Sequence, residues 1–119
     1  MTAPPPVFAK AQAELAPLIK ANGLVQVRTE CHEQAFGSAF AEYRGAGVAL
    51  RLVWDGKEAM LFAEVLVDGR WNDVETLEQG RPPAVDRDHS DRRIARILQA
   101  ATTVLSRVAS ARPSLRPDP

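Results

Sequence analysis

The tetrapeptide Glu30-Cys31-His32-Glu33 gathers four side chains that could bind a metal ion or supply a nucleophile. A cysteine and a histidine that face each other form the reactive pair of thiol enzymes, and both residues are common zinc ligands. The alternation around the tetrapeptide predicts a strand, so Cys31 and His32 project from opposite faces and cannot act on one atom. Glu30 and His32 share a face but supply only two ligands, whereas zinc takes three or four. We therefore expect neither a metal site nor a catalytic pair here.

The segment "DRDHSDRR", residues 86–93, places His89 among three aspartates, where it could act as a general acid or base. Acidic residues and a serine just before a helix are already explained by capping and by the helix dipole. Asp55 and Asp68 each precede a glycine, which is typical of turn residues without another role. We therefore predict no catalytic residue and no cofactor, and expect that the protein is not an enzyme.

The composition is that of an ordinary globular protein: 119 residues, 45% hydrophobic, 25% charged, with 15 basic and 15 acidic side chains. The length predicts one domain over residues 1–112 with a disordered tail at 113–119. A single cysteine fits a reducing compartment. We see neither a secretory signal nor an apolar run of the roughly 20 residues that span a bilayer. We expect a small bacterial protein in the cytoplasm that makes no membrane contact.

Helical spacing of apolar residues predicts one helix near each end of the chain. "VFAKAQAELAPLIKANG", residues 7–23, should end at Asn22-Gly23, with a kink at Pro17 or a regular part that ends near Ala16. The later helix follows residue 90. Its continuous stripe consists of Ile94, Ile97, Leu98, Ala101, Val104, Leu105 and Val108.

Between residues 24 and 74 the period changes to two, which predicts strands. Asp55-Gly56 and Asp68-Gly69 favour tight two-residue hairpin turns, and residues 44–47 form a looser third turn. The pattern predicts an α+β fold: an antiparallel meander of four to five strands with both helices packed on one face. Residues 76–90 are expected to be a long polar connection that is either functional or mobile.

Turn geometry also predicts which side chains share a face. A two-residue turn at Asp55-Gly56 would pair Leu52 with Ala59 and Leu50 with Leu61. The core face then holds Val48, Leu50, Leu52, Leu61, Ala63, Val65 and Val67. The opposite face holds Ala49, Arg51, Val53, Met60, Phe62, Glu64, Leu66 and Trp71. An even loop at residues 44–47 adds Phe40 to the opposite face across from Arg51, whereas an odd loop sends Phe40 to the core.

The opposite face is too apolar for a sheet surface that contacts only water. Its candidate binding residues are Phe40, Arg51, Met60, Phe62, Leu66 and Trp71. Aromatic, methionine and arginine side chains are enriched at interface centres. The leading hypothesis is a protein-interaction module of the chaperone, adaptor, immunity-protein or inhibitor type. It would dimerise or bind a different protein, unless the 76–90 connection or the N-terminal segment folds over this face.

Two alternatives come from other classes of function. Residues 81–116 hold eight arginines against three acidic residues, and Arg92, Arg93 and Arg96 are expected off the apolar stripe of the helix. Such a basic helix face predicts a nucleic-acid-associated regulator, although it lacks a base-reading motif.

The other alternative is a small-ligand binder or enzyme whose site lies beside the 76–90 connection. Its residues would be Trp71, Asp73, Glu75 and His89. This reading requires the four side chains to meet around one pocket.

Overall fold

The structure, a computed structural model, describes residues 5–45, 47–81 and 89–110. Its elements are α1 (Pro6–Ala21), β1 (Val25–His32), a 3-10 turn (Glu33–Ala35), β2 (Ser38–Gly45), β3 (Val48–Asp55), β4 (Met60–Val67), β5 (Arg70–Asp73), α2 (Val74–Gln79) and α3 (Asp91–Ser110). The strands form one antiparallel sheet in the order β1-β2-β3-β4-β5. The predicted α+β fold is confirmed, whereas the predicted tail at 113–119 lies outside the described residues.

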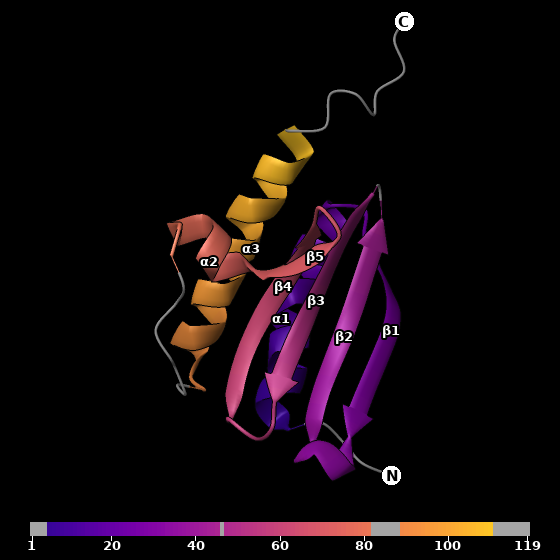
Figure 1. The fold of residues 1–119 in the computed structure, drawn as a ribbon, viewed down its shortest axis with the longest axis vertical. Coiled ribbons are helices and arrows are strands. Elements are labelled where there is room, and N and C mark those ends of the chain that lie inside the picture. The colour runs from indigo at the N-terminus through magenta and orange to yellow at the C-terminus, as the bar shows by residue number, and fades with distance from the viewer. Residues whose placement is uncertain (1–4, 46, 82–88, 111–119) are drawn as a thin grey trace, which may run out of the picture.

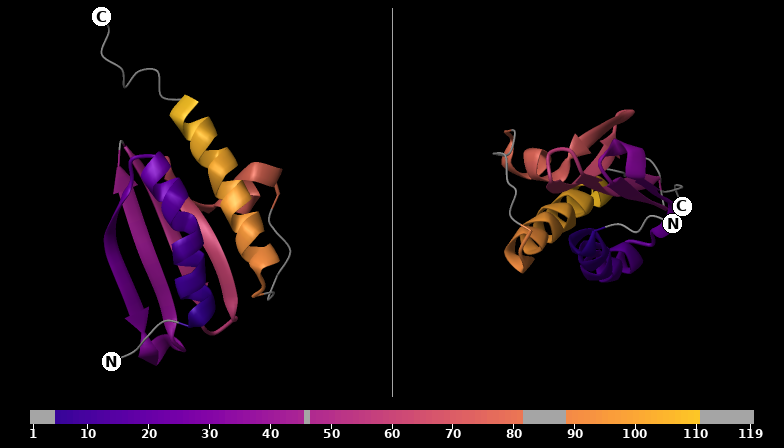
Figure 2. Two further views of the ribbon diagram at one scale, coloured as in Figure 1. Left: turned by 180° about the vertical axis from the view of Figure 1, so that it is seen from behind. Right: turned by 90° about the horizontal axis from the view of Figure 1, so that it is seen from below.

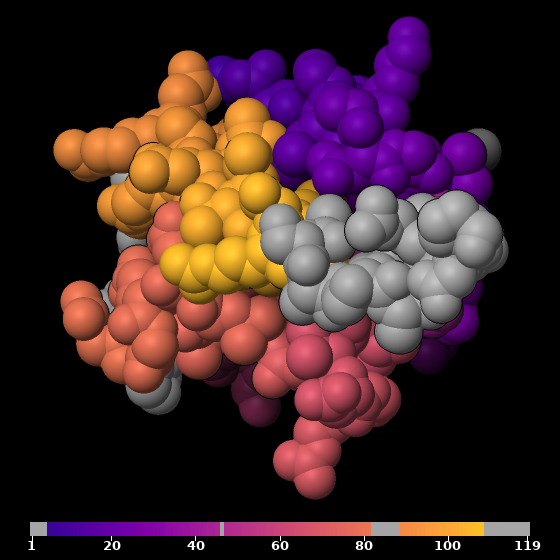
Figure 3. All heavy atoms as spheres, turned by 90° about the horizontal axis from the view of Figure 1, so that it is seen from above, coloured from indigo at the N-terminus to yellow at the C-terminus, as the bar shows by residue number. Residues whose placement is uncertain are grey.

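The molecule has two layers, with the sheet on one side and α1 and α3 together on the other. In Figure 1 both helices lie behind the strands, and in the left view of Figure 2 they lie in front of them. α1 contacts β2 and β3, while α3 contacts β4. α3 also packs between α1 and α2, as seen from its C-terminal end in Figure 3. One face of the sheet is therefore buried by helices.

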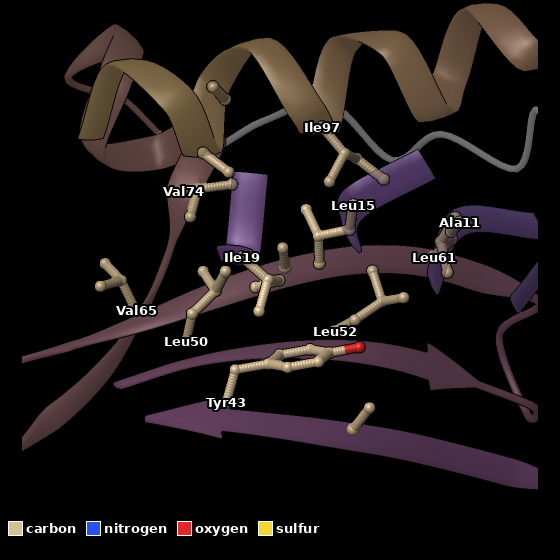
Figure 4. Close-up of a cluster of buried hydrophobic side chains, with 14 of the residues drawn as sticks. Ala11, Leu15, Ile19, Tyr43, Leu50, Leu52, Leu61, Val65, Val74 and Ile97 are labelled. Carbon is tan, nitrogen blue, oxygen red and sulfur yellow. The ribbon is translucent and has the colours of Figure 1, made fainter. Parts of the chain in front are cut away.

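The core lies between the helices and strands β2, β3 and β4. Figure 4 shows Leu15 of α1 and Ile97 of α3 pointing toward Leu50 and Leu52 of β3. The side chains of Leu50, Leu52, Leu61, Val65 and Ala63 are all buried on this side of the sheet. The predicted stripe of α3 packs into or against this core along its whole length, from Ile94 to Val108. The predicted amphipathic helix is therefore confirmed.

α1 continues past its internal proline. The predicted end near Ala16 is wrong, because the helix runs to Ala21 with Pro17 inside it. Pro17 is exposed, so the hydrogen bond that it cannot donate is lost on the solvent side of the helix. Ile19 is buried and holds the last turn against the core. The helix ends at Asn22-Gly23 as predicted, and the backbone N–H of Asn22 donates to the Leu18 carbonyl at 3.1 Å.

The β3–β4 turn is longer than its Asp55-Gly56 sequence predicts. Asp55 pairs with Met60, so four residues form the turn, and the register is Leu52 with Ala63 and Leu50 with Val65. The Asp55 carboxylate accepts the backbone N–H groups of Lys57 and Glu58 at 3.0 and 3.1 Å. The predicted two-residue turn is wrong, and each residue of β3 pairs with a residue of β4 four positions later than predicted. An even change leaves every side chain on its predicted face.

The 76–90 connection begins with a helix, α2, that was not predicted from the sequence. In α2 the Asp73 carboxylate accepts the N–H groups of Glu75 and Thr76 at 2.8 and 3.1 Å. Gly80 ends the helix with φ 76°, the left-handed conformation that glycine adopts without steric cost. An aspartate and a glycine that bracket six residues were the available signal. Residues 82–88 lie outside the described part, so covering by that segment stays untested.

Candidate protein-binding face

The sheet face opposite the helices, here called the second face, is turned toward the viewer in Figure 1. Only residues 46 and 47 lie between the paired Gly45 and Val48, so the β2–β3 loop is even and Phe40 lies on this face. Its cross-strand neighbour is Val53, so the predicted position across from Arg51 is wrong. All six predicted binding residues lie on the second face and are half-buried: Phe40, Arg51, Met60, Phe62, Leu66 and Trp71.

A row of charged side chains crosses the middle of the second face. Its members are successive cross-strand partners from β1 to β5: Arg28, Glu42, Arg51, Glu64 and Asp73. The signs alternate over the first four strands. Arg51 Nη2 lies 2.6 Å from Glu64 Oε1, and Glu42 is also paired with Arg44. We call this set the charged row.

The apolar residues of the second face form two groups, one on each side of the charged row. Phe40, Val53 and Phe62 are cross-strand neighbours on one side. Met60, the first residue of β4, lies next to Phe62 on the same face. Leu66 and Trp71 are paired on the other side. The single patch expected around Met60, Phe62, Leu66 and Trp71 is thus interrupted by Glu64. The cause is the strand period, which places Glu64 between Phe62 and Leu66 on the same face.

Arginines of the charged row cover the aromatic rings beside them. The Cζ atom of Arg51 lies 4.3 Å from the centroid of the Trp71 ring, and that of Arg28 lies 5.1 Å from the Phe40 centroid. The His32 ring stacks on Phe40 with a centroid separation of 6.5 Å. Such contacts contribute about 0.5–1 kcal/mol at exposed sites. The rings are therefore half-buried because side chains of their own sheet lie across them.

Strand β1 departs from the predicted alternation at a bulge between Gln26 and Arg28. In a strand without a bulge, Val25 and Val27 would share a face with Thr29 and Cys31. Val25 instead pairs with Arg44 and so belongs to the second face. Both valines are exposed, at 62% and 51%. The extra residue of a bulge changes which face the following side chains occupy. β1 therefore adds an apolar side chain to the rim of the second face.

The Glu30-Cys31-His32 segment is divided between the two faces as predicted. His32 Nε2 lies 2.9 Å from Glu30 Oε1, whereas Cys31 packs against the core cluster. Arg28 Nε donates to Glu30 Oε2 at 2.5 Å, and this hydrogen bond holds the pKa of Glu30 below its ordinary value. Glu30 is thus ionised at neutral pH, at the end of β1 that carries Arg28 and His32.

Arg93 does not lie on the predicted basic helix face. Its side chain is buried, with Nη1 2.6 Å from Glu75 Oε1, and Nη2 donates to the Leu61 carbonyl at 2.9 Å. The signal was present, because Arg93 stands four residues before Ile97 and so shares its face of α3. Only Arg92 and Arg96 of the predicted set are exposed. A phosphate contact through three arginines is therefore wrong for this helix.

The four residues of the predicted small-ligand site do not converge. Trp71 lies on the second face, while Glu75 pairs with Arg93 in the interior. His89 Nε2 lies 2.8 Å from the Ala59 carbonyl, and its ring meets Trp54 edge-on at 5.1 Å. Asp73 caps α2. Each side chain has a structural contact of its own, at a different place.

Replacing Asp73 by alanine should lower the free energy of unfolding by about 0.5–2 kcal/mol, because two N–H groups of α2 lose their acceptor. Asp73→Asn retains a side-chain oxygen at the same position and should remain close to the wild type. Urea unfolding of both variants measures the difference. Equal stability of the alanine and asparagine variants would contradict a capping role.

No protein-family model, curated protein sequence or solved structure matches the chain. Over residues 5–45, 47–81 and 89–110, no helix is long and apolar enough to cross a membrane. In the same residues no three side chains of histidine, cysteine, aspartate or glutamate are grouped so that they could hold a metal ion.

Proposed function

We propose that the protein is a non-enzymatic interaction module that binds another protein chain through the second face of its sheet. One observation carries the proposal: the face opposite the helices presents two apolar groups of side chains around a paired charged row. An antiparallel sheet that meets water on one face ordinarily carries polar residues there. Aromatic, methionine and arginine side chains are the residues enriched where proteins bind each other.

The arrangement of the face supports binding to a protein surface in preference to a small molecule. Arginine side chains lie over the aromatic rings of Phe40 and Trp71. Small-ligand sites, by contrast, are concave. The guanidinium of Arg51 can keep its contact with Trp71 while it forms new hydrogen bonds outward. Chaperones, adaptors, immunity proteins and inhibitors all act through surfaces of this kind, so the proposal covers that class.

Photo-crosslinking in the native cell tests the proposal. A benzophenone amino acid at Val53, in the apolar group of the second face, should form an adduct with a protein chain. Phe62→Asp places a charge beside that position and should weaken the association about 30-fold, as expected for a central interface residue. The variant should remain folded, with a loss of about 1–2 kcal/mol in the free energy of unfolding.

Gln99→Asp is the matched control, because Gln99 is exposed on α3 on the other side of the molecule. It should leave the adduct unchanged, and the crosslinker placed at Gln99 itself should give none. If Val53 forms no adduct, or if Phe62→Asp and Gln99→Asp affect it equally, the second face is not the binding surface.

A further inference from the structure

The charged row has an order of signs that is complementary to itself. We infer that the partner is a second copy of this chain, related by a two-fold axis parallel to the strands between β2 and β3. The inference rests on the proposed function of the second face. This rotation lays β1 over β4 of the other copy and β2 over β3. Arg28 then faces Glu64 of the second copy, and Glu42 faces its Arg51. Symmetry repeats both contacts, so four opposite-charge pairs form.

Two other axes in the plane of the sheet, one along the charged row and one along β3, bring like charges together. An axis along the charged row places each of its residues over the same residue of the second copy. An axis along β3 places Arg51 over itself and Glu42 over Glu64. Like charges opposed across an interface cost several kilocalories per mole, so the axis between β2 and β3 is the one that the charges favour.

The same rotation brings two kinds of apolar pair into contact, while Phe62 lies over Glu30 of the second copy. On one side of the charged row, Phe40 in β2 lies over Val53 in β3 of the second copy, and the reverse contact follows by symmetry. On the other side, Val25 in β1 lies over Leu66 in β4. Val25, which is 62% exposed in the single chain, thereby gains an apolar neighbour.

The second face is large enough for a specific dimer. Strands β1 to β4 have eight residues each. Eight residues extend about 26 Å, and four strands span about 19 Å, so the plane of the face covers about 500 Å² per copy. Two copies bury about 1,000 Å², the lower end for a stable interface. Parallel stacking of the two sheets also agrees with the aligned packing of sheets in sandwiches.

The open edge of β1 is the competing site for a second copy, and its own features argue against it. A bulge interrupts the strand between Gln26 and Arg28, and Arg28 and Glu30 place charges along it. Bulges and edge charges are the devices by which proteins prevent strands from pairing edge to edge. The bulged edge is therefore the less suitable surface.

A charge-swap experiment with the full chain tests the dimer. Arg51→Glu opposes two glutamates across the axis and Glu42→Arg opposes two arginines, so each variant alone should dimerise about 100-fold or more weakly than the wild type. An equimolar mixture restores opposite charges at both contacts and should form a mixed dimer within about tenfold of the wild-type affinity. Sedimentation equilibrium measures the association of the 13.0 kDa chains, and isotope labelling of one variant identifies the mixed species.

Lys57→Glu and Glu14→Arg are the matched controls, because they make the same charge changes at exposed positions outside the second face. Both should dimerise like the wild type. If either swap variant fails to fold by circular dichroism, Arg28→Glu with Glu64→Arg tests the second contact in the same way.

Three results would overturn the inference: a wild-type chain that stays monomeric at millimolar concentration, a dimer that neither reversal weakens, or a mixture that does not recover. The crosslinked adduct at Val53 separates these failures from failure of the proposed function. An adduct with a different protein overturns the second copy as partner but supports binding by the second face.

Discussion

Replacing Glu75 by alanine is expected to lower the free energy of unfolding by about 3–5 kcal/mol. Glu75 and Arg93 are 5% and 3% exposed, and their facing atoms lie 2.6 Å apart. Without the carboxylate, the guanidinium is a buried charge with no opposite charge to compensate its lost hydration. The hydrogen bond from Arg93 to the Leu61 carbonyl compensates only part of that loss. Urea unfolding followed by circular dichroism measures the effect.

The double variant Glu75→Leu, Arg93→Met is the matched control for this prediction. Replacement of a buried ion pair by apolar side chains of similar volume is often neutral or stabilising, because neither group then loses its hydration. We expect the double variant to be more stable than either single variant. Within the described residues, Arg93 Nε has no hydrogen-bond partner, which adds to the cost of burying the pair. A single variant within about 1 kcal/mol of the wild type would show that water reaches the pair.

Leu15→Ala is expected to cost about 3–5 kcal/mol. Leu15 is 2% exposed and lies where α1, α3 and β3 meet, pointing toward the strands (Figure 4). A small void of about 10 Å³ is already present there, lined by Leu15, Leu52 and Ile97 among others. The shorter side chain enlarges that void, and two helices held on a sheet cannot move together to close it.

Leu18→Ala serves as the control, since Leu18 is on the same helix but half-buried. It should cost about 1–2 kcal/mol, because less apolar area returns to water and no enclosed cavity forms. The difference between the two variants in urea unfolding is the readout. Equal losses in the free energy of unfolding would mean that the buried Leu15 contributes no more to stability than the half-buried Leu18.

The sequence correctly predicted which side chains of β3 and β4 share a face, even though the predicted register between these two strands was wrong. The β3–β4 turn has four residues where two were predicted, yet Phe62 lies on the second face as expected. A shift by four residues preserves facing, since strand side chains alternate with period two. The amphipathic stripe of α3 could be read for the same kind of reason, because its apolar spacing is a local property.

The predictions failed where contacts between residues distant in the chain determine the local structure. Arg93 reads as a surface residue from its type, and only the approach of α2, which carries Glu75, makes its burial possible. The bulge in β1 comes from how that strand pairs with β2. The six residues of α2 form a helix too short to be stable alone, so it depends on packing against α3.

The alternation of apolar and polar residues by itself determined the two-layer fold and which side chains of β3 and β4 face away from the helices. Periodicity is a local property, so it can be read along the chain. Tertiary structure alone decided that one row would align Arg28, Glu42, Arg51 and Glu64 across four strands. That alignment depends on the relative registers of three strand pairs. Turn lengths and a bulge set those registers, and their geometry follows from contacts between residues distant in the chain.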